Sequence, residues 1–279
     1  MADLAVTGST GRLGGRVARL LAAAGRPQRL VVRDPGRAPD LPGAEVVKAS
    51  YDDGPACRAA LSGVDTLFMV SGAETLERVA QHKAFVDAAV AAGVQHVVYT
   101  SFANSSPEAT FTLARDHFAT EEHIRASGLA FTFLRDNLYL DFFPLFVGEG
   151  DVIRGPAGDG RTAAVALDDI ADVAVAVLTD PGPHAGRTYE LTGPVAITMA
   201  EGAAALAAAT GRPIRYEAET IEEAYASRSV YGAPEWQVTA WVTTYTAVAA
   251  GDLEHVSGDV ERLTGHPPRS LTDVLRPKT

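Results

Sequence analysis

The sequence contains a single cysteine, Cys57, among its 279 residues. One thiol cannot form an internal disulfide, and it cannot supply the several thiolates of a zinc or iron–sulfur cluster. Cys57 falls early in an expected helix, where we expect a small buried side chain rather than a redox centre. No charged and then apolar leader precedes the first strand, so we predict a cytoplasmic protein.

Long hydrophobic runs and an excess of basic residues are also missing. No apolar run approaches the ~20 residues of a membrane-spanning helix, so no membrane association is expected. The formal net charge is −11, which argues against non-specific binding to nucleic acid because such binding needs a basic surface. With 47% hydrophobic and 21% charged residues, the composition is that of an ordinary globular protein.

Three catalytic patterns are absent. The seven histidines include no pair at HExxH or similar spacing, so we predict no metal site. Ser71 and Ser101 end expected strands, but neither lies in a G-x-S-x-G hydrolase motif. None of the eight tyrosines has a lysine four residues further on, and the chain has only three lysines. The tyrosine–lysine proton relay used in short-chain alcohol and ketone chemistry is therefore missing.

The beginning of the chain carries the clearest functional pattern. Residues 2–7 form an apolar run typical of a buried strand, glycines follow at positions 8, 11 and 14, and residues 16–24 are expected to form a helix. This arrangement makes a phosphate cradle, because unpaired N–H groups at a helix N-terminus point at an anion and glycine lets the pyrophosphate approach the backbone. The spacing differs from the common G-x-G-x-x-G, but its position between a strand and a helix predicts a bound dinucleotide.

Apolar runs alternate with helical patterns through the first half of the chain. Strands are expected over residues 29–33, 45–48, 66–71, 96–101 and 130–135, and helices over 55–61, 76–92 and 112–126. The runs are apolar on both faces, so this alternation predicts a Rossmann-type α/β fold with a doubly wound parallel sheet. Ligands of such sheets bind beyond the carboxyl ends of the strands.

The pattern loosens after residue 140. Residues 148–161 contain five glycines and one proline and are expected to form a loop region. Helices are expected over 168–178, 198–210, 221–229, 235–250 and 258–264, and a strand over 187–192 is expected to rejoin the main sheet. We predict a dinucleotide-binding domain over residues 1–140, rejoined by parts of 165–193, and a smaller C-terminal α/β lobe over 141–279 that binds the substrate.

The residue that ends the second expected strand bears on the choice of cofactor. An acidic side chain there would bind the adenosine ribose, but this chain has Arg33. A guanidinium suits a 2′-phosphate in charge and in bidentate geometry, so NADP(H) is the preferred cofactor. The adjacent Asp34 keeps NAD(H) open, and a solvated Arg33 is the structural alternative. Arg12 could reach the nucleotide phosphates or lie in solvent, and Thr10 could hydrogen-bond the turn.

His117 is a candidate replacement for the missing relay. It falls in the helix expected over 112–126, with Glu121 one turn further on the same face. His117 could contact the nicotinamide ribose or move a proton; alternatively, it is a surface histidine paired with Glu121. Aromatic residues that could stack on a flat substrate, or simply form core, are Phe131, Phe133, Tyr139, Phe142, Phe143 and Phe146.

With these motifs the chain resembles the NmrA-like, atypical short-chain dehydrogenase/reductase group, and within it the bacterial NAD(P)H:quinone oxidoreductases. The matching segments run nearly from end to end. They are VTGSTGRLG (6–14), VVRDP (31–35), ASYDD (49–53), the long segments 81–101 and 116–139, GPAGDGRTAAV (155–165) and LTGHPPRSL (263–271).

The resemblance implies the positions of the cofactor-binding residues. Those of the glycine turn are Gly8, Thr10, Gly11, Arg12, Leu13 and Gly14. Arg33 would meet the 2′-phosphate, with Ser50 and Tyr51 by the adenine, although relatives often have aspartate at the Ser50 position. The residues that would line the cofactor channel are Val70, Ser71, Gly72, Thr100, Ser101 and Phe102. The candidate catalytic residues are His117, which falls where many relatives have lysine, and Asn137 and Tyr139, which border the nicotinamide and substrate.

A quinone acceptor is compatible with the missing relay, because water can protonate the hydroquinone anion. The protein must mainly bind and orient the nicotinamide and exclude solvent. We therefore predict an NADPH-dependent oxidoreductase that transfers hydride to a quinone or similar conjugated small molecule. The alternative is an NAD(P)-binding redox-sensing regulator without turnover that acts through a protein partner. The chain is expected to be a monomer or a homodimer.

Overall fold

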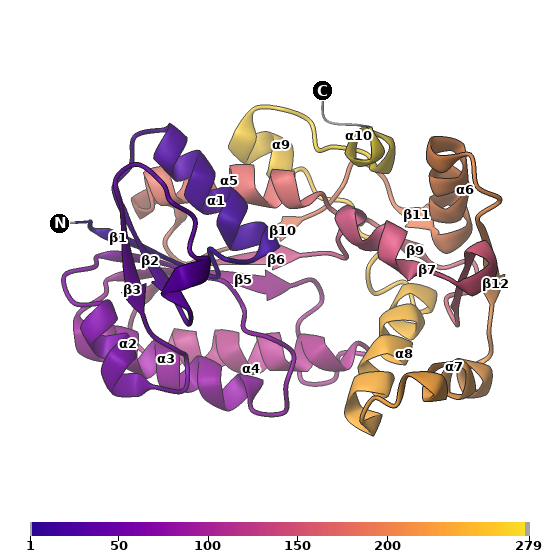
Figure 1. The fold of residues 1–279 in the computed structure, drawn as a ribbon, viewed down its shortest axis with the longest axis horizontal. Coiled ribbons are helices and arrows are strands. Elements are labelled where there is room, and N and C mark those ends of the chain that lie inside the picture. The colour runs from indigo at the N-terminus through magenta and orange to yellow at the C-terminus, as the bar shows by residue number, and fades with distance from the viewer. Residues whose placement is uncertain (1, 277–279) are drawn as a thin grey trace. The chain divides into compact units, whose positions relative to one another are not determined.

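The computed structural model describes residues 2–276 (Figure 1). This part of the chain divides into two compact units. The first comprises the chain up to residue 102 together with residues 116–135 and 168–189, and the second comprises 103–115, 136–167 and the residues from 190 onward. The domain boundary expected at residue 140 stays a prediction.

A seven-stranded sheet runs in the order β10-β6-β5-β4-β1-β2-β3. Its strands, in chain order, are β1 (Leu4–Thr7), β2 (Gln28–Val32), β3 (Ala44–Lys48), β4 (Thr66–Met69), β5 (His96–Phe102), β6 (Ala130–Asp136) and β10 (Arg187–Leu191). The pairs β1–β2, β1–β4, β2–β3 and β4–β5 are parallel. This is the Rossmann order with β10 added at one edge, and the strand order reverses between β1 and β4. The predicted fold class and the return of a late strand to the main sheet are confirmed.

Helices cover both faces of this sheet (Figure 1). On one side lie α1 (Arg12–Ala23) and α5 (Leu167–Thr179), and on the other lie α2 (Gly54–Ala60), α3 (Arg78–Ala92) and α4 (Thr112–Ala126). The apolar core under α2–α4 includes Cys57, Phe85 and Phe133, all fully buried. Cys57 is therefore the small buried residue that its position predicted. Among the described residues, no helix combines the length and apolar character that crossing a membrane requires.

Helix α1 begins at Arg12 rather than at the expected Arg16. The expected start was wrong because Gly14 of the turn and the following Gly15 are themselves helical. A Cβ on Gly14 would lie 2.4 Å from the carbonyl oxygen of Gly8, so the first helical turn packs directly on the preceding loop. Gly14 is needed here because the helix packs closely on the preceding loop, and it does not interrupt the helix.

The second unit combines short strands with five helices among the described residues. The strands β12 (Arg215–Ala218), β8 (Val152–Gly155) and β7 (Val147–Gly148) form one small sheet, and β9 (Arg161–Thr162) pairs with β11 (Ile197–Thr198). The helices are α6 (Met199–Thr210), α7 (Ile221–Arg228), α8 (Glu235–Ala249), α9 (Asp259–Thr264) and α10 (Leu271–Leu275).

Residues 148–161, expected to be a loop region, contain the strand β8. Val152 and Ile153 are buried there, and β8 pairs in parallel with β12. The glycines that favoured a loop lie around this strand, and Gly155 ends it where a Cβ would come within 2.3 Å of the Tyr245 ring. A tight approach of an aromatic ring, rather than loop conformation, requires glycine at this position.

Candidate functional site

The glycine turn lies at the carboxyl end of β1, where the strand order reverses. Gly8 has a left-handed φ of +64°, and a Cβ on it would lie 3.0 Å from Cβ of Val70. The Gly11 N–H donates to the Gly8 carbonyl at 2.8 Å, and Gly11 caps α1 without a side-chain hydrogen bond. The first N–H groups of α1 therefore keep hydrogen-bonding capacity for an anion.

A buried hydroxyl in this turn fits the same ligand. Ser9 is 2% exposed, and its Oγ has no hydrogen-bond partner among the described residues. Buried polar atoms in native proteins are nearly always paired, and the phosphates of a dinucleotide would supply acceptors beside the helix N-terminus. Sequence reasoning missed Ser9, although its place directly after the first glycine could have suggested it. Of its neighbours, Thr10 and Arg12 are exposed and Leu13 is buried.

Arg33 extends from the end of β2 and is exposed. Its charge acts on Asp52, which follows the two residues expected near the adenine. The pKa of Asp52 is lowered mainly by a hydrogen bond from Ser50, and to a smaller extent by the charge of Arg33. Asp34 is used differently, because its carboxylate accepts the Gly36 N–H at 3.0 Å and caps a short 3-10 turn. The carboxylate of the adjacent Asp34 is thus engaged by its own turn, while the Arg33 guanidinium is exposed.

Tyr51 links the last residue of β1 to the residue that follows β4. Its hydroxyl lies 2.7 Å from Thr7 Oγ1 and 2.7 Å from the Val70 carbonyl oxygen, and its ring stacks on Phe85 at 4.2 Å between centroids. Burial raises the pKa of Tyr51, so the phenol stays neutral. The hydroxyl serves the fold, and a contact between Tyr51 and adenine stays a prediction.

The segment that follows β4 has its backbone fixed by three hydrogen bonds. The N–H of Val70 donates to Thr7 Oγ1 at 2.8 Å, that of Ser71 to Thr100 Oγ1 at 2.8 Å, and that of Gly72 to His82 Nε2 at 2.8 Å. The structure therefore brings the predicted channel residues of β4 and β5 together beside the glycine turn.

His117 lies in the interior of the first unit. It is 6% exposed, with Nε2 at 2.9 Å from Arg78 Nη2 and Nδ1 at 3.0 Å from the Tyr99 hydroxyl. A guanidinium can only donate, so Nε2 accepts and Nδ1 carries the proton of the neutral ring. Burial and the Arg78 charge hold the pKa of His117 well below its usual value.

The alternative of a surface histidine paired with Glu121 is wrong. Glu121 is itself fully buried and accepts from Ser101 Oγ at 2.6 Å. It also forms ion pairs with Arg125 and Arg135 at 3.0 and 2.7 Å. Helical spacing placed the two residues on one face, but His117 takes its partners from α3 and β5, and Glu121 takes its partners from β5, β6 and its own helix.

Asn137 and Tyr139 belong to the second unit. The Asn137 amide donates to the Leu253 carbonyl at 3.0 Å, and its oxygen accepts from Thr162 Oγ1 at 2.8 Å. The Tyr139 hydroxyl donates to Asp136 Oδ2 at 3.0 Å. Their catalytic roles stay predictions.

Asp136 is a notable buried acid that sequence reasoning missed. It is fully buried, and its Oδ1 has no hydrogen-bond partner among the described residues. Burial raises the pKa of this carboxyl well above its usual value. Its place directly after the strand expected over 130–135 gave no sign of this, because only the folded structure reveals that the carboxyl is enclosed.

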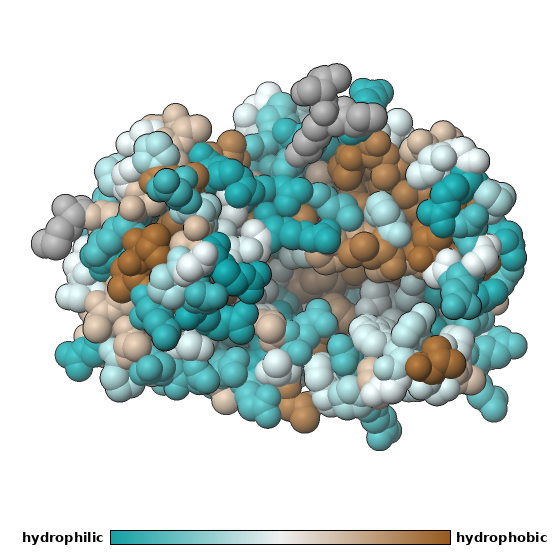
Figure 2. Space-filling model, in the orientation of Figure 1, coloured by the Kyte–Doolittle hydropathy of each residue, from teal (hydrophilic) through white to brown (hydrophobic). Residues whose placement is uncertain are grey.

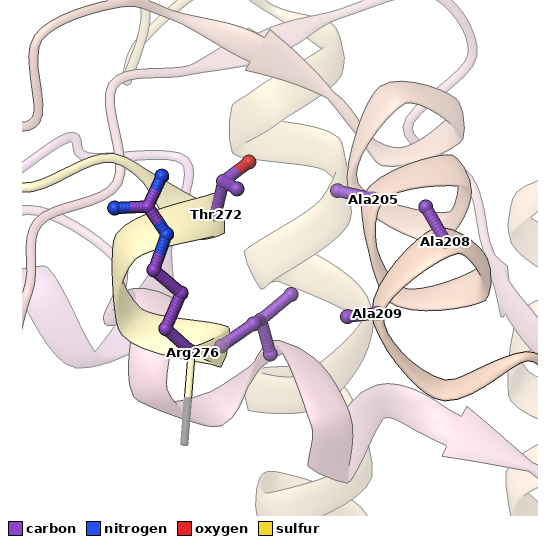
Figure 3. A pocket seen from close by; sticks show the side chains of 6 residues that line it. Ala205, Ala208, Ala209, Thr272 and Arg276 are labelled. Atoms are coloured by element: carbon purple, nitrogen blue, oxygen red, sulfur yellow. The ribbon is translucent and has the colours of Figure 1, made fainter. Parts of the chain in front are cut away.

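A separate pocket of about 290 Å³ lies between α6 and α10, where Figure 2 shows hydrophobic side chains gathered. Figure 3 shows the methyl groups of Ala205, Ala208 and Ala209 on α6 facing α10, with the Arg276 guanidinium turned away from them. The residues that line this pocket do not form a group of titratable side chains. The glycine turn and the residues beside it therefore remain the candidate site.

The model of the NmrA-like family matches residues 2–259. The chain belongs to the NmrA-like family. It is 34% identical to an NAD(P)H azoreductase of Xenophilus azovorans over 97% of this chain and 96% of that protein. It is 33% identical to quinone oxidoreductase 2 of Escherichia coli over 98% and 97%. A crystal structure of an NADPH-dependent quinone oxidoreductase from Escherichia coli, complexed with NADPH, superposes with a TM-score of 0.89 at 31% identity, covering 98% of each chain.

Membership of the NmrA-like family confirms the resemblance expected from the motifs. The family match spans the glycine turn, Arg33, the β4–α3 segment and His117. These relatives are named as an azoreductase and a quinone oxidoreductase, and the solved structure contains NADPH.

Proposed function

We propose that this chain is an NADPH-dependent oxidoreductase that transfers hydride to a quinone or a similar conjugated small molecule. The observation that carries the proposal is the nearly full-length likeness to a quinone oxidoreductase crystallised with NADPH. The uncapped α1 terminus and the unpartnered Ser9 hydroxyl support a bound dinucleotide. The chain would act in the cytoplasm on a freely diffusing acceptor.

NADP(H) is the cofactor that the site favours. Arg33 presents an exposed guanidinium at the end of β2, and a 2′-phosphate offers it a bidentate, charge-assisted partner. Asp34 accepts the Gly36 N–H on Oδ1, so its orientation is set by its own turn and Oδ2 is the oxygen left to accept from a ribose hydroxyl. NAD(H) remains usable with weaker binding, since the rest of the cradle does not depend on the 2′ position.

When bound, the nicotinamide supplies a hydride, and the product anion takes its proton from water. The chain contributes orientation: the fixed backbone of residues 70–72 and the end of β5 form a rigid wall beside the glycine turn. His117 packs behind this wall as a neutral ring, with one nitrogen bonded to Arg78 and the other to Tyr99 on β5. The proposed contribution of Asn137 and Tyr139 is to border the acceptor.

The second candidate is an NAD(P)-binding redox sensor without turnover. The observation that favours it is the engagement of His117 by Arg78 and Tyr99, which leaves the first unit without a free acid–base group at this position. Such a sensor would bind the same cofactor and pass on its redox state through a protein partner.

The two candidates separate in one assay. Purified protein is mixed with NADPH and a panel of quinones, and the loss of NADPH absorbance is followed over time. The reductase predicts oxidation that depends on both protein and acceptor. Tight NADPH binding with no acceptor-dependent oxidation across the panel would overturn the enzyme and leave the sensor.

A further inference from the structure

His82 is a buried histidine that the proposed chemistry does not use. It lies in the second turn of α3 and is fully buried. Its Nε2 accepts the backbone N–H of Gly72 at 2.8 Å, and its Nδ1 lies 2.9 Å from Thr120 Oγ1 on α4. One imidazole therefore links the turn after β4 to two helices.

The hydrogen-bond pattern selects one form of this ring. A backbone N–H is always a donor, so Nε2 must be the unprotonated nitrogen and Nδ1 must carry the hydrogen. The Thr120 hydroxyl accepts from Nδ1 and donates to the Asp116 carbonyl at 2.8 Å. Burial lowers the pKa of His82 to about 3, and the charge of Arg78 adds to this effect. The ring stays neutral and keeps its acceptor at ordinary pH.

The turn that His82 holds lies against the phosphate cradle. Val70 packs on the glycine turn, where a Cβ at position 8 would touch its side chain at 3.0 Å. The glycine at position 72 allows the imidazole to come close, since a Cβ there would lie 3.2 Å from His82 Nε2. A shift of Gly72 would therefore move backbone at the edge of the cradle.

We propose that His82 is a positioning residue for the nicotinamide cofactor: its Nε2 fixes the Gly72 amide, and through it the backbone that the cofactor contacts. This inference rests on the cofactor binding in the proposed function but not on turnover. A preformed wall lowers the ordering cost of binding. Loss of the Gly72 hydrogen bond would leave a buried donor unpaired and the turn less ordered.

Two conservative variants separate positioning from simple packing. The amide oxygen of Gln can occupy the place of Nε2, so His82→Gln keeps the acceptor for Gly72 and loses the contact with Thr120. Asn matches the nearer ring nitrogen, so His82→Asn keeps the contact with Thr120 and loses the acceptor. Each variant loses one hydrogen bond and some volume, so their thermal stabilities are expected to fall together.

A matched control is available in His96. It is also buried, with Nε2 at 2.9 Å from Thr132 Oγ1, and it lies at the opposite end of β5 from Thr100. His96→Gln and His96→Asn should lower stability comparably without changing cofactor affinity, because this histidine holds no residue of the cradle.

The test is the NADPH dissociation constant of full-length protein, measured by nicotinamide fluorescence, with thermal unfolding measured in parallel. We expect His82→Asn to weaken binding about tenfold and His82→Gln by less than about threefold, with both His96 variants like wild type. Equal affinities for His82→Gln and His82→Asn would overturn the proposal. So would equal weakening by His96→Asn, since that would be a general effect of lost stability.

A second comparison keeps the test decisive if His82→Asn does not fold. His82→Leu removes the acceptor for Gly72 with little change in volume, whereas Thr120→Val removes only the partner of Nδ1. We expect NADPH binding to weaken about tenfold in His82→Leu and, as in His82→Gln, by less than about threefold in Thr120→Val; equal affinities of these two variants would contradict the positioning role. A protein that binds NADPH but reduces no quinone would refute the proposed function and leave this comparison valid.

Discussion

The guanidinium of Arg78 lies 2.9 Å from Nε2 of His117, with both side chains buried. This pair determines what His117 can do, since an arginine donor makes that nitrogen an acceptor. The remaining ring nitrogen faces the Tyr99 hydroxyl. The residue at the position of the missing relay is therefore a neutral support, and its replacement should affect the fold before it affects proton transfer.

Stability should fall on acidification because of buried histidines such as His82 and His117. Burial lowers the pKa of both His82 and His117, whereas the unfolded chain binds protons near pH 6.5. The unfolded state then holds more protons, so stability is full above about pH 6.5 and declines below it by up to about 1.4 kcal/mol per pH unit for each ring. Urea unfolding of wild type and His117→Gln across pH 5–8 should show a shallower decline in the variant; identical pH dependence would contradict a neutral buried His117.

Asp136 should produce the opposite pH dependence. Burial raises the pKa of its carboxyl, so the folded state keeps a proton that the unfolded chain releases above about pH 3.9. Stability is full below that pH and declines as pH rises, until the folded carboxyl itself ionises. Asp136→Asn should remove this loss, and the free energy of unfolding of the variant relative to wild type should increase between pH 4.5 and 8. A constant difference would show that Asp136 ionises normally.

Arg33 should discriminate between the two nicotinamide cofactors. Arg33→Ala removes a charge-assisted partner of the 2′-phosphate, which is worth roughly 1.5–3 kcal/mol, or about ten- to a hundredfold in affinity. NADPH binding should weaken by this amount while NADH binding changes little, and Asp34→Ala serves as the neighbouring control. Calorimetric titration with both cofactors checks the prediction, which fails if Arg33→Ala weakens both equally.

Gly14→Ala should disable the cradle. Its Cβ would lie 2.4 Å from the Gly8 carbonyl oxygen, and the three nearest atoms all belong to the backbone of Thr7 and Gly8, which prevents an easy adjustment. We expect a loss of NADPH affinity of at least about tenfold and destabilisation of about 1–3 kcal/mol from overpacking. Gly54→Ala is the matched control, because it also lies in the first turn of a helix and its Cβ would meet nothing within 4 Å. Similar behaviour of the two variants would remove the packing argument.

Local patterns were enough to predict the elements of the first unit. The strand–glycine–helix order at the N-terminus and the alternation up to residue 135 depend on neighbouring residues, and these elements are confirmed within a few residues of their expected limits. The bond from His82 to Gly72 was not predictable. It depends on the rotation of α3 against the end of β4, which helical periodicity does not specify because α3 is buried on more than one side.

Long-range pairing also determines the features of the second unit that local patterns did not predict. The strand β8 is short, and its pairing partner β12 lies about sixty residues later in the chain. The glycines of residues 148–161 therefore predicted a loop, although Val152 and Ile153 are buried in a strand. The enclosure of Asp136 likewise depends on distant segments, as its coupling to Glu190 illustrates. Sequence spacing identified candidate residues here, but not which of them would be enclosed.

The central claim is hydride transfer from NADPH to a conjugated acceptor. The most direct measurement compares acceptor-dependent oxidation of NADPH with that of NADPH deuterated at the transferred position of C4. Hydride transfer to the acceptor predicts oxidation that requires both protein and quinone, with slower turnover of the deuterated cofactor under conditions where hydride transfer limits the rate. Tight binding of NADPH without quinone-dependent oxidation of either form would contradict it.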